Sequence, residues 1–273
     1  MTTNGNRMRV FDFDHAIVRT PGRSVIDGIR SDARAEPSYE KIAQEHAAYV
    51  AALRDAGLAV DVLPPLERFP DSMFVEDPAF VLPEGAIRLR SGAEARRGEG
   101  EEIANAVRRH FETVFVLEGD EYVDGGDVLI APDEIFIGLS KRTNRKGAEA
   151  LHAKLAQLGR KARIAQTPDT ILHFKTAVSL LCEDMVIATK AMAASGIFAD
   201  FKILLVPEDE EPAANLLRVN DIVFVGESFR RTIDLIAKEG LRIVPLPVRE
   251  IGKLDAGLSC MSLRWRAFHN QLY

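Results

Sequence analysis

The sequence is poor in cysteine and has no long apolar run. Its 273 residues contain two cysteines, Cys182 and Cys260, too few and too far apart for a disulfide framework or a cysteine-based zinc site. We therefore expect two reduced thiols and no structural metal. No segment is apolar for long enough to span a bilayer, and residues 1–9 lack the apolar core of a signal peptide. These absences predict a cytoplasmic protein without a membrane partner.

The sequence also lacks a basic tract. With a formal net charge of −6, the chain offers no electrostatic footprint for nucleic acid or for an anionic membrane surface, and its acidic excess favours a small cation instead. Hydrophobic residues make up 47% of the chain, which is enough to bury a full core. No exposed apolar stripe can be separated from the core pattern, so a monomer and a homodimer both remain compatible with the sequence.

A helix followed by a β-rich run occurs five times along the chain. Apolar residues at three- and four-residue spacing predict these helices, and short apolar runs after them predict strands. The expected helices are Ser38–Gly57, Glu99–His110, Lys146–Gly159, Met192–Asp200 and Ser228–Gly240. The expected strands are Leu58–Val62, Val114–Val116, Ala162–Ile164, Ile203–Val206 and Leu241–Val244.

A second series of five polar turns alternates with the first, and each turn opens directly into an apolar strand. The turns are centred on Asp77, Asp127, Thr176, Asn215 and Cys260. A quasi-repeat of roughly 45 residues with strands and one helix per unit predicts a closed radial array. Two unrelated α/β domains are the alternative, but no linker rich in Pro, Gly or Ser divides the chain. We expect one domain over residues 10–273, preceded by a disordered tail at residues 1–9.

Convergence of the five turns on one axis would bring together residues that could perform covalent chemistry. Cys260 follows Gly257-Leu258-Ser259 at a junction between turn and strand, where a thiol can face a cavity. Cys182 lies within an apolar run and is expected in the core. His173 lies three residues before the turn at Thr176 and is a candidate general acid. Asp124 is the candidate carboxylate that would orient this histidine.

The acidic segment from Asp71 to Asp77 predicts a receptor for a cation. Apolar residues separate Asp71 from Glu76 and Asp77, and buried carboxylates are costly unless a cation pairs with them. Arg96 and Arg142 lie in loops after the acidic turns, where they could clamp a carboxylate. Acidic groups combined with an arginine pair indicate a zwitterionic, arginine-like ligand.

Six motifs, in order, resemble those of the dimethylarginine dimethylaminohydrolase family, over nearly the whole chain from about Ile17 to Trp265. The motifs are Phe69-Pro70-Asp71-Ser72-Met73-Phe74-Val75-Glu76-Asp77, Ser91-Gly92-Ala93-Glu94-Ala95-Arg96-Arg97, Asp124-Gly125-Gly126-Asp127, Gly138-Leu139-Ser140-Lys141-Arg142-Thr143-Asn144, Leu172-His173-Phe174-Lys175 and Leu258-Ser259-Cys260-Met261-Ser262. This resemblance implies the fold of the guanidino-modifying, amidinotransferase-like superfamily, a five-fold pseudosymmetric α/β propeller of the pentein type.

The resemblance also implies a role for each site residue. Its catalytic residues are the nucleophile Cys260, the general acid and base His173, and its acidic partner Asp124. It places Asp77, together with Glu76 and the backbone of Leu254, at the substrate guanidinium. It places Asp71 and the carbonyl of Ile29 at the α-amino group. It places Arg96 and Arg142 at the α-carboxylate. Arg23–Ile29 would form a mobile lid over the site.

The activity implied by the resemblance is hydrolysis of Nω-methylated arginine to citrulline through a covalent S-alkylthiouronium intermediate on Cys260. No metal or organic cofactor is needed for this reaction. Two alternatives remain open. One is an arginine deiminase-like enzyme or another guanidine hydrolase acting on unmethylated arginine, and the other is a binding protein for arginine-like ligands that performs no chemistry.

Overall fold

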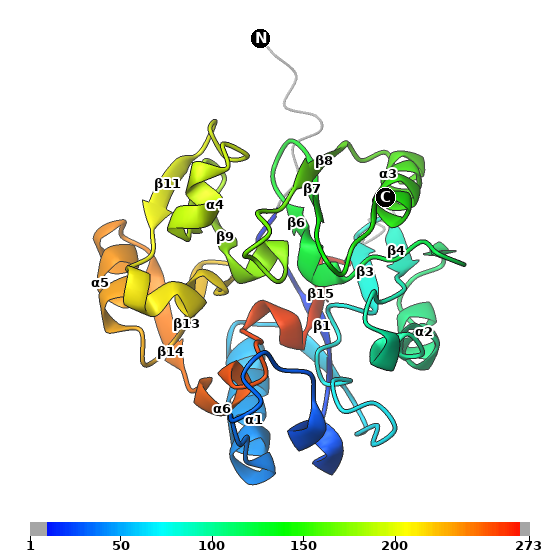
Figure 1. The fold of residues 1–273 in the computed structure, drawn as a ribbon, viewed down its shortest axis with the longest axis horizontal. Helices are drawn as coiled ribbons and strands as arrows, with labels where there is room; N and C mark the ends of the chain where they lie inside the picture. Colours follow the sequence, from blue (N-terminus) through cyan, green and yellow to red (C-terminus); the bar gives the residue numbers. More distant parts are fainter. Residues whose placement is uncertain (1–9, 268–273) are drawn as a thin grey trace, which may run out of the picture.

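Five three-stranded sheets are arranged around a central axis (Figure 1). The structure is a computed structural model, and it describes residues 10–267. The expected disordered tail at residues 1–9 lies outside the described residues. No helix between residues 10 and 267 has both the length and the apolar character needed to cross a membrane.

Each sheet has the same order of strands. In the second sheet, the axial strand β3 (Ala79–Leu82) pairs antiparallel with the middle strand β4 (Gly85–Arg88). The chain then forms helix α2 (Glu99–Arg108) and returns as the outer strand β5 (Val114–Val116), parallel to β4. The unit is therefore a β-hairpin followed by a helical crossover, with the helix at the periphery (Figure 1).

The next three sheets repeat this unit. The third contains β6 (Val128–Ile130), β7 (Ile135–Leu139), α3 (Arg145–Gln157) and β8 (Ala162–Gln166). The fourth contains β9 (Val178–Cys182), β10 (Met185–Ala188), α4 (Lys190–Ala194) and β11 (Lys202–Leu205). The fifth contains β12 (Leu217–Val219), β13 (Ile222–Gly226), α5 (Arg230–Lys238) and β14 (Arg242–Leu246).

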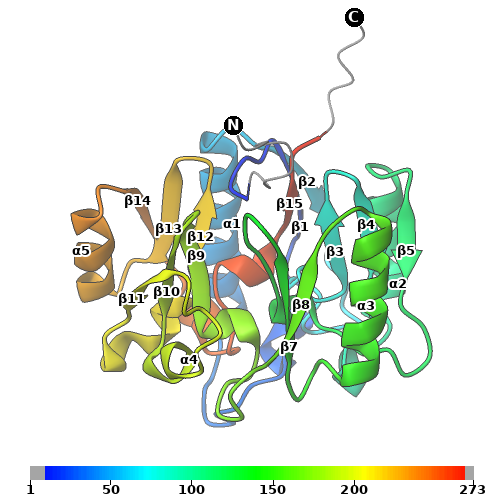
Figure 2. The ribbon, with the colours of Figure 1, turned by 90° about the horizontal axis from the view of Figure 1, so that it is seen from above.

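The first sheet closes the array by joining the two ends of the described chain. It contains β1 (His15–Arg19), α1 (Tyr39–Asp55) and β2 (Ala59–Leu63), and its axial strand is β15 (Leu263–Trp265) from the other end of the sequence. Figure 2 shows β1 and β15 side by side. A short helix, α6 (Arg249–Gly252), precedes β15. The closed radial array expected from the repeat is confirmed.

The middle strands form the walls of the core. Every residue of β7 and β13 is buried, as expected for strands that are covered on both faces. Outer strands such as β8 and β14 are only partly buried. The middle strands were not predicted separately from the sequence. Hairpin signals do precede some of them: Asn220-Asp221 lies directly before β13, and Asn220 has a φ of +55°.

The five helix-to-strand units are confirmed, but the bounds predicted for the fourth helix, Met192–Asp200, were wrong. Helix α4 starts at Lys190 because the Thr189 side chain accepts a hydrogen bond from the Met192 N–H and caps the first turn. It ends before Gly196, whose φ is +74°. Phe198, in the expected helix, instead packs against Phe136 at a ring distance of 4.9 Å.

The turns that precede the axial strands bind one another in sequence around the axis. We call these turns the axial turns; they are centred on Asp77, Asp127, Thr176, Asn215 and Cys260. Four contacts join them directly: Gly126 N–H to Asp77 Oδ1 at 3.0 Å, Phe174 N–H to Asp127 Oδ1 at 2.8 Å, Ser259 N–H to Asn215 Oδ1 at 3.2 Å, and Glu76 N–H to the Cys260 carbonyl at 3.2 Å. Between the turns at Thr176 and Asn215 the contact is made by Ser179 in β9, whose Oγ–H donates to the Ala214 carbonyl at 2.7 Å.

We expect Gly125→Ala to destabilise the fold because two axial turns approach each other closely at this position. A Cβ atom on Gly125 would lie 1.9 Å from the carbonyl oxygen of Glu76. Gly252→Ala is the matched control, since a Cβ atom there meets nothing within 4 Å. Urea unfolding should show a loss of roughly 1–3 kcal/mol or more for Gly125→Ala and little change for Gly252→Ala. Equal stability of the two variants would contradict this close packing.

Candidate active site

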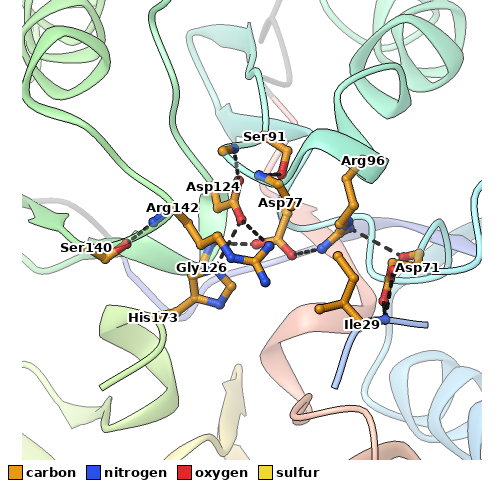
Figure 3. Close-up of polar contacts among 12 residues, drawn as sticks. Ile29, Asp71, Asp77, Ser91, Arg96, Asp124, Gly126, Ser140, Arg142 and His173 are labelled. Atoms are coloured by element: carbon orange, nitrogen blue, oxygen red, sulfur yellow. Dashed lines mark hydrogen bonds and ion pairs between the residues drawn. The ribbon is translucent and has the colours of Figure 1, made fainter. Parts of the chain in front are cut away.

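A cavity of about 170 Å³ lies where the axial turns meet. Eight of the residues expected at the site line it: Ile29, Asp71, Asp77, Arg96, Arg142, His173, Leu254 and Cys260. Figure 3 shows how several of these side chains converge from different sheets and loops. The structure therefore brings together a thiol, an imidazole, carboxylates and guanidinium groups that are far apart in the sequence.

Cys260 places its sulfur in this cavity beside two hydrogen-bond donors. The Asn215 amide nitrogen lies 3.4 Å from Sγ, and the Gly257 backbone nitrogen lies 3.5 Å from it. Removal from bulk water, together with the negative charges of Glu76 and Asp77, raises the pKa of the Cys260 thiol to about 11, although the two donors oppose this shift. The Cys260 thiol is therefore protonated at neutral pH.

His173 and Asp124 form the pair expected from the sequence. Nε2 of His173 lies 3.1 Å from Oδ2 of Asp124, whose other oxygen accepts a hydrogen bond from the Gly92 N–H at 3.0 Å. Asp124 is fully buried behind the histidine and does not line the cavity. Burial lowers the pKa of His173, but the bond to Asp124 and the negative charges of Asp127 and Asp77 raise it to about 9. His173 is thus an imidazolium at neutral pH.

Almost all N–H donors of the Arg96 guanidinium are used in hydrogen bonds within the protein. Its Nε and Nη2 donate to the two carboxylate oxygens of Glu99 at 2.9 and 2.7 Å, and its Nη1 donates to Asp77 at 2.5 Å. Nη2 also donates to the carbonyl oxygen of Phe74 at 3.1 Å. Among the contacts of the described residues, one Nη1 N–H of Arg96 is left for a ligand.

Glu99 was not among the expected site residues, although its carboxylate fixes the guanidinium of Arg96. Burial raises the pKa of Glu99 to about 7, although the positive charge of Arg96 acts to lower it. The only sequence signal was the three-residue spacing from Arg96, which is common at the start of a helix. Sequence reasoning could not distinguish Glu99 from an ordinary surface acid at a helix N-terminus.

The acids around Arg96 outnumber the cations. Asp71, Asp77 and Glu99 all interact with this single guanidinium. Burial raises the pKa of Asp71, whereas Arg96, His173 and the Gly126 N–H outweigh burial and hold the pKa of Asp77 below its usual value. A ligand that brings positive charge into the cavity would compensate this excess of buried carboxylates.

Arg142 is the more available arginine of the expected pair. Its side chain is 16% exposed, compared with 6% for Arg96, and its Nη1 lies 3.8 Å from Asp124. The Arg142 backbone N–H donates to Ser140 Oγ at 2.9 Å, which fixes the loop that carries this residue. The two arginines face the same cavity, as Figure 3 shows.

The structure does not place Glu76 in this cavity. Its carboxylate pairs with Lys175 at 2.6 Å and Arg264 at 3.3 Å, and it accepts a hydrogen bond from Ser259 Oγ at 3.0 Å. Glu76 and Lys175 line a second cavity of about 110 Å³ instead. The Glu76 carboxylate affects the Cys260 thiol only through its charge.

The segment expected to form a lid covers part of the cavity. The Ile29 N–H donates to both carboxylate oxygens of Asp71, at 3.1 and 3.2 Å. Ser31 donates to Asp255 twice, from its backbone nitrogen at 2.5 Å and from Oγ at 2.9 Å. Sequence reasoning missed Ser31 and Asp255, although they adjoin two expected residues, Ile29 and Leu254.

Asp77, Asp124 and His173 lie close enough together to hold a metal ion by distance alone. Their oxygens and ring nitrogen already bind one another and neighbouring backbone N–H groups. Arg96 and Arg142 also supply positive charge at Asp77 and Asp124. This donor set suits a buried ion-pair network better than a divalent cation.

Five repeated units whose axial turns converge on one cavity define the pentein-type α/β-propeller class. A family model described as N,N dimethylarginine dimethylhydrolase, eukaryotic, matches residues 24–196. The N(G),N(G)-dimethylarginine dimethylaminohydrolase of Pseudomonas aeruginosa is 39% identical over 93% of this chain and 100% of that protein. This chain belongs to the dimethylarginine dimethylaminohydrolase family of hydrolases.

Solved structures agree with this relationship. A cysteine-to-serine mutant of the Pseudomonas aeruginosa enzyme, complexed with citrulline, is 39% identical with a TM-score of 0.90, over 93% of this chain and 100% of that chain. A histidine-to-glycine variant of a dimethylarginine dimethylaminohydrolase, in an adduct with S-methyl-L-thiocitrulline, is also 39% identical with a TM-score of 0.90, over 92% and 99% of the two chains. The family and the fold expected from the sequence are confirmed.

We expect the charge of His173 to make the fold less stable as the pH rises from 6.5 to about 9. The folded pKa exceeds the unfolded value, so the stabilisation is fully present below pH 6.5 and is lost as the pH rises through the folded pKa. The loss should be roughly 3 kcal/mol relative to His173→Gln over the same window. Urea unfolding measures this difference, and an NMR titration of the imidazole locates its midpoint. A midpoint at or below 6.5 would contradict the role of the Asp124 pair.

Proposed function

We propose that this chain hydrolyses Nω-methylated arginine, both asymmetric dimethylarginine and monomethylarginine, to citrulline and dimethylamine or methylamine. The observation that carries this proposal is the convergence of Cys260 and the His173–Asp124 pair on one cavity with Asp77. The relatives support the substrate class, since one was captured with citrulline and another as an adduct with S-methyl-L-thiocitrulline.

The substrate would lie with its two charged ends in different parts of the cavity. Asp77 receives the guanidinium, Asp71 and the Ile29 carbonyl receive the α-amino group, and the backbone of Leu254 borders the reacting end. Arg142 would be the main ligand of the α-carboxylate because Arg96 has one N–H left to contribute. Glu76 would add negative charge near the guanidinium without contacting it.

Binding of the substrate would activate the nucleophile. A guanidinium next to Cys260 offsets the negative charges that raise the pKa of the thiol, and so it favours the thiolate. The thiolate attacks the central guanidinium carbon, and the protonated His173 gives its proton to the departing amine. The carbon–nitrogen bond breaks and an S-alkylthiouronium intermediate remains on Cys260.

Hydrolysis of the intermediate would reverse the role of the histidine. His173, now neutral, takes a proton from water, and the resulting hydroxide attacks the thiouronium carbon. The tetrahedral species loses its hydroxyl proton to water and its carbon–sulfur bond breaks, which forms the citrulline carbonyl and releases the Cys260 thiolate. Asp124 holds the imidazole in orientation through both steps. Apart from the attacking water, residues of the chain supply the groups used in this scheme.

We further propose that the enzyme acts in the cytoplasm, as a monomer or homodimer. Both cysteines are free thiols, a pattern typical of proteins in a reducing compartment.

The test is to incubate the purified protein separately with asymmetric dimethylarginine, monomethylarginine and arginine, and to follow citrulline and the released amine by mass spectrometry. We expect citrulline with dimethylamine or methylamine from the methylated substrates. Cys260→Ser should bind the substrate but lose turnover, because a hydroxyl is a far weaker nucleophile than a thiolate here. Citrulline from arginine alone would indicate a deiminase, and saturable binding without product would indicate a binding protein.

We expect Arg142→Ala to weaken substrate binding through loss of the carboxylate contact. KM for dimethylarginine should rise roughly tenfold or more, the effect of one charge-assisted hydrogen bond. Lys141→Ala is the matched control, because Lys141 is the exposed neighbour of Arg142. Kinetics with a methylated agmatine, which lacks the carboxylate, should show no such penalty for Arg142→Ala. An equal rise in KM with both substrates would contradict the assignment.

A further inference from the structure

Three of the axial turns use an equivalent side chain to hold the next turn. Oδ1 of Asp77 accepts the Gly126 N–H at 3.0 Å, and Oδ1 of Asp127 accepts the Phe174 N–H at 2.8 Å. Oδ1 of Asn215 accepts the Ser259 N–H at 3.2 Å. An aspartate therefore suffices for this structural contact, and Asn215 departs from the pattern.

Cys260 occupies the corresponding place in the fifth turn, but its side chain does not accept a hydrogen bond from the backbone of the following turn. Its carbonyl oxygen accepts the Glu76 N–H at 3.2 Å instead. This backbone contact closes the series of axial turns and leaves the sulfur to face the cavity. The fold therefore leaves the thiol, the strongest nucleophile of the series in its ionised form, without a structural contact to the following turn.

The amide of Asn215 provides an N–H donor, which an ionised carboxylate lacks. Because Oδ1 must face the Ser259 N–H, Nδ2 must face the opposite way, and it lies 3.4 Å from Sγ of Cys260. Gly257 permits this approach, since a Cβ atom there would lie 2.4 Å from Cγ of Asn215. The orientation of the amide is thus fixed by contacts on both sides.

The surroundings of the sulfur explain why it needs such a donor. Glu76 and Asp77 place negative charge near Cys260, and this charge disfavours a thiolate. The Asn215 amide and the Gly257 N–H are the hydrogen-bond donors to Sγ among residues 10–267. A hydrogen bond to a charged acceptor is stronger than one to a neutral acceptor, so both donors favour the anion over the thiol.

We propose that Asn215 is a catalytic residue whose amide N–H stabilises the Cys260 thiolate, when it attacks the substrate and again when it leaves the intermediate. The part that concerns turnover depends on the function proposed above, whereas the effect on the thiolate does not. Asn215 is buried and does not line the substrate cavity, so it acts on the sulfur without contacting the substrate.

Alkylation of Cys260 by iodoacetamide tests the effect on the thiolate without any substrate. The rate is followed as a function of pH by mass spectrometry of the peptide that contains Cys260, in Asn215→Asp and Asn215→Ala. Asn215→Asp keeps the acceptor for Ser259 and removes the donor to sulfur. Asn220→Asp is the matched control, because Asn220 also accepts from a backbone N–H and donates to a carbonyl, those of Phe13 and Ala56.

Both Asn215 variants should be alkylated roughly tenfold or more slowly than the wild type below the thiol midpoint, and the midpoint should rise. Asn220→Asp should behave as the wild type. Slow alkylation of Asn215→Asp with a normal rate for Asn215→Ala would overturn the proposal, since added charge would then explain the effect. Normal rates in both variants would also overturn it. Should Asn215→Ala fail to fold, Asn215→Ser takes its place as the uncharged variant.

Steady-state kinetics then separate this inference from the proposed function. In both Asn215 variants, kcat for dimethylarginine should fall roughly tenfold or more, while KM stays near the wild-type value. A wild-type protein that fails to hydrolyse methylarginine would refute the proposed function, but slow alkylation of the Asn215 variants would still support the hydrogen bond to the thiolate. A rise in KM without a fall in kcat would contradict the catalytic role.

Discussion

The hydrogen bonds that join the axial turns hold the propeller together at its centre, and the site depends on them. Asp77 and Asp127 each bind the backbone of the following turn, so their carboxylates are part of the fold before any ligand arrives. The Cys260 carbonyl completes the series at Glu76. Because a side chain at the axis contacts two turns, a shift of one turn would move the cavity wall beside it.

The second constraint on the site is electrostatic. Arg96 is bound by Asp77 and Glu99 within the protein, and Asp71 lies nearby, so three buried acids share one guanidinium. Asp77, together with Glu76, disfavours a Cys260 thiolate, and the acidic groups would bind the cationic groups of an arginine derivative. Recognition of the substrate and activation of the nucleophile are then two consequences of a single charge distribution.

Much of the fold could be predicted from local patterns in the sequence. Periodic apolar residues located α1, α2, α3 and α5, and the polar turns located the start of every axial strand. The middle strands were missed because their short hairpins carry weak turn signals. The bounds of α4 were wrong because a Thr189 cap and Gly196 decide them, and local capping overrides a faint helical period.

The sequence by itself determined the family, the repeat and the identity of Cys260, His173 and Asp124 as candidates, since these depend on residue types and their order. Only the tertiary structure decided which contacts these residues make. The guanidinium of Arg96 donates to the Glu99 carboxylate, and the Glu76 carboxylate pairs with Lys175 instead of lining the cavity. Asn215 lies beside Sγ across 45 positions of sequence. The contacts of Glu76 and Asn215 join different sheets, and no local spacing encodes them because closure of the propeller sets their distances.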